Sequence, residues 1–175
     1  KEITYGKDLA ADYSYSHVSQ TSVGILFVIK HKGVEYSIAA PVLGEHMAEN
    51  VCGCFAMAKE INIDEKIILD TIGEFKGIKR RLEKKSEGKI TIYDDLGHSP
   101  AKAATTLKTL RAIYPNNKII AIFEPNTGNR KSQSIPGYAN AFADADEVII
   151  PTLTRIKTDP KDIDPPFDGK KLTEV

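Results

Sequence analysis

The amino-acid sequence predicts an α/β fold in which a β-hairpin and two helices precede a mainly parallel sheet covered by helices. Three observations predict this fold. "GILFVIK" and "VEYSIAAP" are apolar strands separated by the turn "HKG", two helical patterns follow them, and after a polar stretch apolar strands alternate with helices. Strands that alternate with helices are typical of a parallel sheet, because neighbouring parallel strands need a long crossover connection.

Two strands and two helices account for the first part of the chain. After the hairpin, a helix is predicted from His46 to about Ile61, and a second one begins at Asp64, which has the side chain of a good N-cap. Apolar residues recur at helical spacing in both, namely Met47, Val51, Phe55 and Ala58 in the first and Ile67, Ile68, Ile72 and Phe75 in the second. Each helix is therefore expected to bury one face.

The second part begins after "GIKRRLEKKSEGK", a polar, glycine-containing stretch typical of a domain linker. "KITIYDD", "KIIAIFE" and "DEVIIP" are predicted strands. "SPAKAATTLKTLRAIYP" is a predicted helix with Ser99 as N-cap and Pro100 at its first position, and "IPGYANAFADA" is a shorter one. The proline- and aspartate-rich segment "TRIKTDPKDIDPPFDGK" is expected to be a loop.

Composition and charge exclude several classes of protein. The chain has 175 residues, 41% hydrophobic and 27% charged, as in soluble globular proteins. Lys+Arg and Asp+Glu both number 24, so no net charge recruits nucleic acid or an anionic membrane surface. With no apolar run of membrane-spanning length and no signal peptide, we expect a cytoplasmic protein. Because the sequence lacks an initiator Met, we also expect a piece of a longer protein.

The two cysteines, Cys52 and Cys54, lie in an apolar helical pattern. No second Cys or His pair stands at the spacing of a zinc site, so the sequence predicts buried free thiols and no metal ligands.

In a parallel sheet, functional residues gather where strands end and helices begin. Three segments qualify, which are Asp94–His98, Glu124–Arg130 and Pro151–Arg155. For Asp94, Asp95 and His98 the residues leave three interpretations open: a solvated loop, a metal site or a nucleotide contact. The chemistry of the third would be as follows. A carboxylate can accept hydrogen bonds from both ribose hydroxyls, and a histidine can donate to a phosphate or position an amine.

Three further motifs carry residues suited to ligands. "KRRLE" offers Arg80 and Arg81 either as a solvated basic linker or as a phosphate clamp. Arg130 in "FEPNTGNRK" suits the capture of a carboxylate. His46 and Asn50 in "LGEHMAEN" share one helical face, where Asn50 is either a polar first-turn residue or a partner for an adenine edge. No G-x-x-x-x-G-K-[ST] phosphate-binding loop occurs in the sequence.

The order of these motifs resembles a known family. "TYG … LGEHMAEN … FKGIKRRLE … YDDLGHSP … TLKTLRAIYP … FEPNTGNR" is similar to the C-terminal half of the Mur ligases. The matching family patterns are G-x-H-N-x-x-N, F-x-G-x-x-R-R-F/L, D-D-Y/F-G/A-H-H-P, and F-Q-P-H-x-x-x-R or F-E-P-R. The likeness is strongest to the ligases that join L-alanine to UDP-N-acetylmuramate and to those that recycle murein tripeptide.

The resemblance implies a domain organisation and a reaction. Residues 1–78 would be the end of a central ATPase domain whose P-loop lies upstream, and 79–175 would be a Rossmann-like C-terminal domain. The implied enzyme uses ATP and Mg²⁺ to phosphorylate the carboxylate of UDP-N-acetylmuramate. An amino acid, with L-alanine expected, then attacks the acyl phosphate to form an amide for peptidoglycan.

The resemblance also implies roles for single residues. Asn50 would contact adenine with His46 beside it, Arg81 would reach the ATP phosphates, and Asp95 would hold the ribose. His98 would line the site near the incoming amine. The acceptor's carboxylate would pair with Arg130, and Asn126, in the same loop, would bear on the choice of acceptor.

Three positions depart from the family pattern. Met47 stands where Asn is usual, Ser99 where a second His is usual, and Asn126 where His or Arg is usual. Gly97 and Arg130 favour an L-alanine ligase, whereas "FEP" favours a murein-tripeptide recycling ligase. A non-catalytic nucleotide- or partner-binding module is the alternative from another class.

Overall fold

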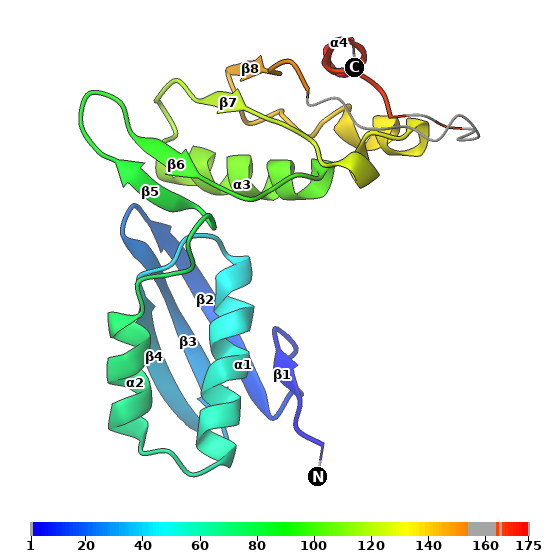
Figure 1. Ribbon diagram of the computed structural model, residues 1–175. Coiled ribbons are helices and arrows are strands. Elements are labelled where there is room, and N and C mark those ends of the chain that lie inside the picture. The colour runs from blue at the N-terminus through cyan, green and yellow to red at the C-terminus, as the bar shows by residue number, and fades with distance from the viewer. Residues whose placement is uncertain (1, 154–163, 165, 175) are drawn as a thin grey trace. The chain divides into compact units, whose positions relative to one another are not determined.

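The computed structural model describes residues 2–153, 164 and 166–174 and has the expected α/β fold. The chain forms two compact units, Lys1–Tyr93 and Asp94–Val175 (Figure 1). The boundary expected from the sequence, after residue 78, stays a prediction. None of the helices described is long and apolar enough to cross a membrane.

The first unit is a four-stranded sheet with two helices on one face (Figure 1). β1 runs parallel to β2, and β2, β3 and β4 form an antiparallel meander. Lys32 and Gly33 both have positive φ, as a tight two-residue hairpin turn between β3 and β4 requires, so the predicted hairpin is confirmed. The elements are β1 Tyr5–Gly6, β2 Tyr13–Thr21, β3 Gly24–His31, β4 Val34–Ala40, α1 His46–Glu60 and α2 Glu65–Glu74.

Helix α1 contributes the largest part of this unit's core. Its buried residues are Ala48, Val51, Cys52, Phe55 and Ala56. The Phe55 ring is fully buried and packs against the rings of Tyr13 and Tyr36. Burial also raises the pKa of the Cys52 thiol to about 11, which keeps it protonated and unreactive. The prediction for Cys54 was wrong, because that side chain is exposed, two residues and about 200° around the helix from Cys52.

Helix α2 begins as predicted but buries less of its surface. The Asp64 carboxylate accepts hydrogen bonds from the backbone N–H groups of Lys66 and Ile67, so the predicted N-cap is confirmed. Ile68 is buried and Ile72 packs on the core. Ile67 and Phe75 are 58% and 43% exposed, so the sequence pattern overestimated the buried face.

The segment predicted to be a linker contains a strand. β5 Glu83–Ser86 pairs with β6 Ile92–Asp94 in a two-stranded sheet. The first strand of the predicted parallel sheet therefore pairs with β5 and is shorter than expected. The composition of β5, "EKKS", has none of the apolar alternation by which a strand is recognised.

The second unit holds the parallel strand pair. β7 Ile120–Ile122 and β8 Glu147–Ile149 run parallel and side by side (Figure 1). Its helices are α3 Pro100–Ile113 and α4 Gly169–Leu172, with 3₁₀ helices at η1 Thr127–Asn129 and η2 Ser132–Tyr138. Ser99 occupies the N-cap position of α3 as predicted, although its side chain accepts no capping hydrogen bond. The predicted short helix at 135–145 is instead the 3₁₀ helix η2, which starts three residues earlier, followed by turns.

A small aromatic core and one ion pair hold this unit together. Phe123, Tyr138 and Phe167 are buried together, with Phe123 and Phe167 each edge-on to the Tyr138 ring. The Asp146 carboxylate accepts hydrogen bonds from the Ile119 N–H and the Arg111 guanidinium, each at 2.7 Å. These contacts lower the pKa of Asp146 and fix the start of β7 against α3. Most of the predicted loop after β8 lies outside the described residues.

Candidate functional site

The turn after β6 carries Asp95 and His98. One Asp95 carboxylate oxygen accepts a hydrogen bond from the Gly97 N–H at 2.6 Å, and His98 Nδ1 lies 2.8 Å from the Leu96 carbonyl oxygen. A carbonyl only accepts, so Nδ1 carries the proton of the neutral ring. A Cβ at position 97 would lie 2.6 Å from the Asp95 oxygen, so a larger residue there would displace this carboxylate. The local sequence thus folds both side chains into one tight turn.

A second loop, after β7, lies against this turn. The Asn126 N–H donates a hydrogen bond of 3.4 Å to the His98 carbonyl oxygen. The Asn126 side-chain oxygen accepts from the Asn129 backbone N–H at 3.1 Å and from its side-chain amide at 2.6 Å, so Asn126 shapes the turn that leads to Arg130. Two segments distant in sequence are therefore joined where β6 and β7 end, although these two strands lie in different two-stranded sheets and not in the single parallel sheet expected from the sequence.

Arg130 is a buried cation, with 6% of its surface exposed. Its Nε donates to the Phe167 carbonyl oxygen at 3.1 Å, and its own carbonyl accepts from the Phe167 N–H at 2.7 Å. The Tyr138 hydroxyl donates a hydrogen bond to the carbonyl oxygen of Asn129, the residue before Arg130. Sequence reasoning placed Arg130 at the sheet edge but missed Phe167, since no local pattern connects residues so far apart in the chain.

The remaining candidates lie in the first unit. His46 is the first residue of α1 and Asn50 lies one turn later; both are exposed. The Asn50 amide is 3.5 Å from the Met47 sulfur, a weak contact. Arg81 is exposed between Arg80 and Leu82, both of which have positive φ, so the backbone turns sharply here. Within the described residues the Arg81 guanidinium has no hydrogen bond or ion pair.

Three of the seven candidates thus lie in the first unit and four in the second. The structure brings His98 and Asn126 together, with Asp95 and Arg130 in the same two loops. Across the residues that are described, no group of three or more His, Cys, Asp or Glu side chains is arranged to hold a metal ion.

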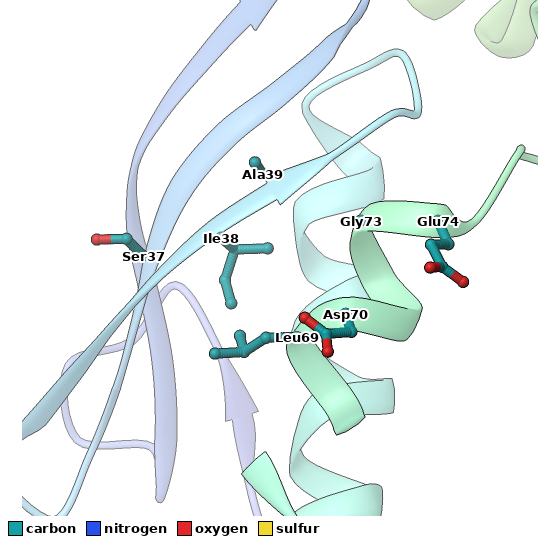
Figure 2. Close-up of a pocket in the computed structure, with 7 residues that line it drawn as sticks. All are labelled: Ser37, Ile38, Ala39, Leu69, Asp70, Gly73 and Glu74. Atoms are coloured by element: carbon teal, nitrogen blue, oxygen red, sulfur yellow. The ribbon is translucent and has the colours of Figure 1, made fainter. Parts of the chain in front are cut away.

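A cavity of about 400 Å³ lies in the first unit between β4 and α2. Figure 2 shows Ile38 and Leu69 pointing toward one another there, with Asp70 and Glu74 on the helix side. Asp70 already forms an ion pair with Lys66 at 2.6 Å. None of the seven candidate site residues lines this cavity, so it lies apart from the predicted chemistry.

Comparison with known proteins gives consistent matches. Residues 80–169 match the family described as "Mur ligase, glutamate ligase domain". The chain is 31% identical over 155 residues to the UDP-N-acetylmuramate–L-alanine ligase of Caulobacter vibrioides and 33% identical over 152 residues to that of Pelobacter propionicus. Each match covers 85% of this chain and 33% of the relative, so the chain spans about a third of their length.

The fold is also similar to that of a solved ligase structure. The crystal structure of UDP-N-acetylmuramate-alanine ligase from Thermotoga maritima superposes with a TM-score of 0.80 and 23% identity, covering 99% of this chain and 36% of that one. The family match over residues 80–169, more than half of the chain, shows that the chain belongs to the Mur ligase family.

Proposed function

We propose that the chain is part of an ATP-dependent ligase that joins an amino acid, L-alanine, to the carboxylate of UDP-N-acetylmuramate in peptidoglycan synthesis. The observation that carries this proposal is the junction of two loops at the ends of β6 and β7, linked by the Asn126–His98 hydrogen bond. These loops hold four of the residues expected to touch nucleotide and acceptor. The curated relatives named above are L-alanine ligases, which favours that acceptor over murein tripeptide.

Asp95 and His98 would serve the nucleotide and the amine. The Gly97 turn uses one of the several acceptor sites of the Asp95 carboxylate, and ribose hydroxyls are donors that suit such a group. With Nδ1 donating to the Leu96 carbonyl, Nε2 is the acceptor nitrogen of that tautomer of the His98 ring. An acceptor nitrogen suits a role near the incoming amine, which must lose a proton as it attacks.

Arg130 and Asn126 would recognise the acceptor. A guanidinium fork matches the two oxygens of an amino acid's carboxylate, and burial at 6% exposure strengthens such a pair by removing it from water. Asn126 stands in the same turn, so its amide would contribute to the choice between a small amino acid and a peptide.

His46, Asn50 and Arg81 would bind ATP from the first unit. The exposed amide of Asn50 has both a donor and an acceptor for an adenine edge, and the exposed Arg81 guanidinium keeps its charge for phosphate oxygens. Mg²⁺ would accompany ATP and neutralise charge on the transferred phosphoryl group.

The reaction balances as follows. A carboxylate oxygen of UDP-N-acetylmuramate attacks the γ-phosphorus of ATP, which forms an acyl phosphate and releases ADP. The amine of L-alanine then attacks the carbonyl carbon and gives up a proton, for which His98 Nε2 is the proposed acceptor; the bond from carbon to the phosphate oxygen breaks, and phosphate leaves. Water would hydrolyse the acyl phosphate, so the site must exclude it. Because two of the three substrates, ATP and UDP-N-acetylmuramate, are nucleotides of the cytoplasm, we propose a cytoplasmic location.

The test uses the full-length protein that contains this chain. Phosphate release from ATP is measured with UDP-N-acetylmuramate plus L-alanine, with each omitted in turn, and with murein tripeptide in place of L-alanine. We expect release only when both substrates are present, and faster release with L-alanine. Faster release with the tripeptide would assign the recycling reaction instead, and no release under any condition would support the non-catalytic module.

A further inference from the structure

The loop that carries Arg130 is held by a segment far along the chain. We call Asp164 and residues 166–168 the C-terminal arm. The Ser132 N–H and hydroxyl both donate to the Asp164 carboxylate, at 2.9 and 2.8 Å. Lys131 Nζ donates to the Asp164 carbonyl oxygen at 2.5 Å. One aspartate thus binds two consecutive residues of the loop.

Phe167 anchors the arm on its other side. Its side chain is buried, edge-on to the Tyr138 ring. Its N–H and carbonyl bond the Arg130 carbonyl and Nε, at 2.7 and 3.1 Å. The arm therefore makes hydrogen bonds to three successive residues, Arg130, Lys131 and Ser132, while its aromatic ring is fixed in the core.

These contacts fix the guanidinium of Arg130. Nε lies in the plane of the guanidinium fork, so a hydrogen bond from Nε to the main chain sets the orientation of that plane. An arginine held in one orientation loses less rotamer entropy when a carboxylate binds than a freely rotating one. Asp164 supports this geometry indirectly, since it fixes the backbone two residues after Arg130.

We propose that Asp164 is a positioning residue for the acceptor: through Ser132 and Lys131 it holds the Arg130 loop in the conformation that binds the acceptor's carboxylate. This inference rests on the proposed function. Asp164 would act through the loop that it binds, so its effect should fall on binding of the acceptor and leave the use of ATP unchanged.

The experiment compares D164A and D164N with D168N in the full-length protein. Asp168 belongs to the same arm, but its carboxylate caps α4 by accepting from the Lys171 N–H, so D168N is the matched control. We expect D164A to raise the KM for the acceptor roughly tenfold, the effect of losing about one charge-assisted hydrogen bond, with the KM for ATP unchanged. D164N keeps one acceptor oxygen for Ser132, so its effect should be smaller, and D168N should match the wild type.

Hydrogen exchange supplies a readout that does not depend on activity. Peptides covering 126–132 should exchange faster in D164A than in D168N, whereas peptides covering α3 should exchange equally and so report an intact fold. Unchanged exchange at 126–132, or faster exchange with an unchanged KM for the acceptor, would each overturn the positioning role. If the wild type forms no amide, the proposed function fails and this role with it, while the exchange data still show whether the arm holds the loop.

Discussion

The two units of the chain are stabilised in different ways. In the first, a sheet and α1 bury a continuous cluster of aromatic and aliphatic side chains around Phe55. In the second, the buried cluster is smaller and the loops are held mainly by hydrogen bonds to backbone groups, including those of the C-terminal arm. Two residues of its strand β7, Ile120 and Ile122, are 51% and 74% exposed.

This difference indicates in which unit substitutions can change the choice of ligand without unfolding the protein. A well-packed core resists substitution, because removing one side chain leaves a cavity. Loops held by a few polar contacts tolerate substitutions that keep those contacts, so they can vary in what they bind. The candidate residues for the acceptor, Asn126 and Arg130, lie in the second kind of region.

The largest effect is expected in the first unit, from Phe55→Ala. This ring is 0% exposed and packs against Tyr13 and Tyr36. We expect a loss of about 3–5 kcal/mol in the free energy of unfolding of that unit, measured by urea denaturation with circular dichroism. Met57→Ala is the control, because Met57 lies in the same helix but is 67% exposed, and it should cost less than about 0.5 kcal/mol. Similar costs for both variants would contradict the assignment of Phe55 to a well-packed core in the first unit.

A functional effect is expected in the second unit, from Arg130→Ala in the full-length protein. We expect the KM for the acceptor amino acid to rise about tenfold or more while the KM for ATP is unchanged, because a charged hydrogen bond to the carboxylate is lost. Steady-state kinetics with each substrate varied in turn measure both constants. An equal effect on the two substrates would refute an acceptor role and indicate a structural one.

Asp95 should show the opposite selectivity. We expect Asp95→Ala to raise the KM for ATP several-fold, through loss of about one ribose hydrogen bond, and to leave the acceptor unaffected. Asp95→Asn retains an oxygen for the Gly97 N–H, so comparing the two variants separates the turn from the ribose contact. An unchanged KM for ATP in both variants would remove Asp95 from the site.

The smallest effect concerns Asp146. Its pKa is lowered below 3.8, first by the Ile119 N–H and then by Arg111. A lowered folded-state pKa contributes stability that is present above the ordinary value and is lost as pH falls through the folded-state pKa. The stability difference between wild type and Asp146→Asn should therefore be constant from about pH 7 to 5 and shrink below about pH 4. A difference that grows on acidification would contradict this assignment.

Local signals in the sequence were sufficient for much of the fold. The Asp64 N-cap, the hairpin turn at Lys32 and Gly33, and the start of α3 at Pro100 each depend on neighbouring residues, and the structure confirms them. The prediction of a linker was wrong for β5, because its four polar residues pair through backbone groups and the side chains carry no pattern that reveals the pairing.

For the candidate site, too, the sequence predicted local features but not contacts between distant segments. The alternation of strands and helices predicted that Asp95 and Asn126 follow strands, and they do follow β6 and β7, but the single parallel sheet expected to unite these strands is absent from the described residues. The burial of Arg130 and its bonds to Phe167 could not be predicted, because they depend on a tertiary contact with the arm. The residue roles themselves stay predictions until the variants are measured.

The central claim, activation of a carboxylate by ATP, is tested most directly by isotope transfer. UDP-N-acetylmuramate labelled with ¹⁸O in its carboxylate is incubated with the full-length protein, ATP and L-alanine, and the released phosphate is analysed by mass spectrometry. If an acyl phosphate forms and the amine displaces phosphate from it, one labelled oxygen passes to phosphate for every amide formed. Amide formation with unlabelled phosphate, or phosphate release without amide, would contradict the account.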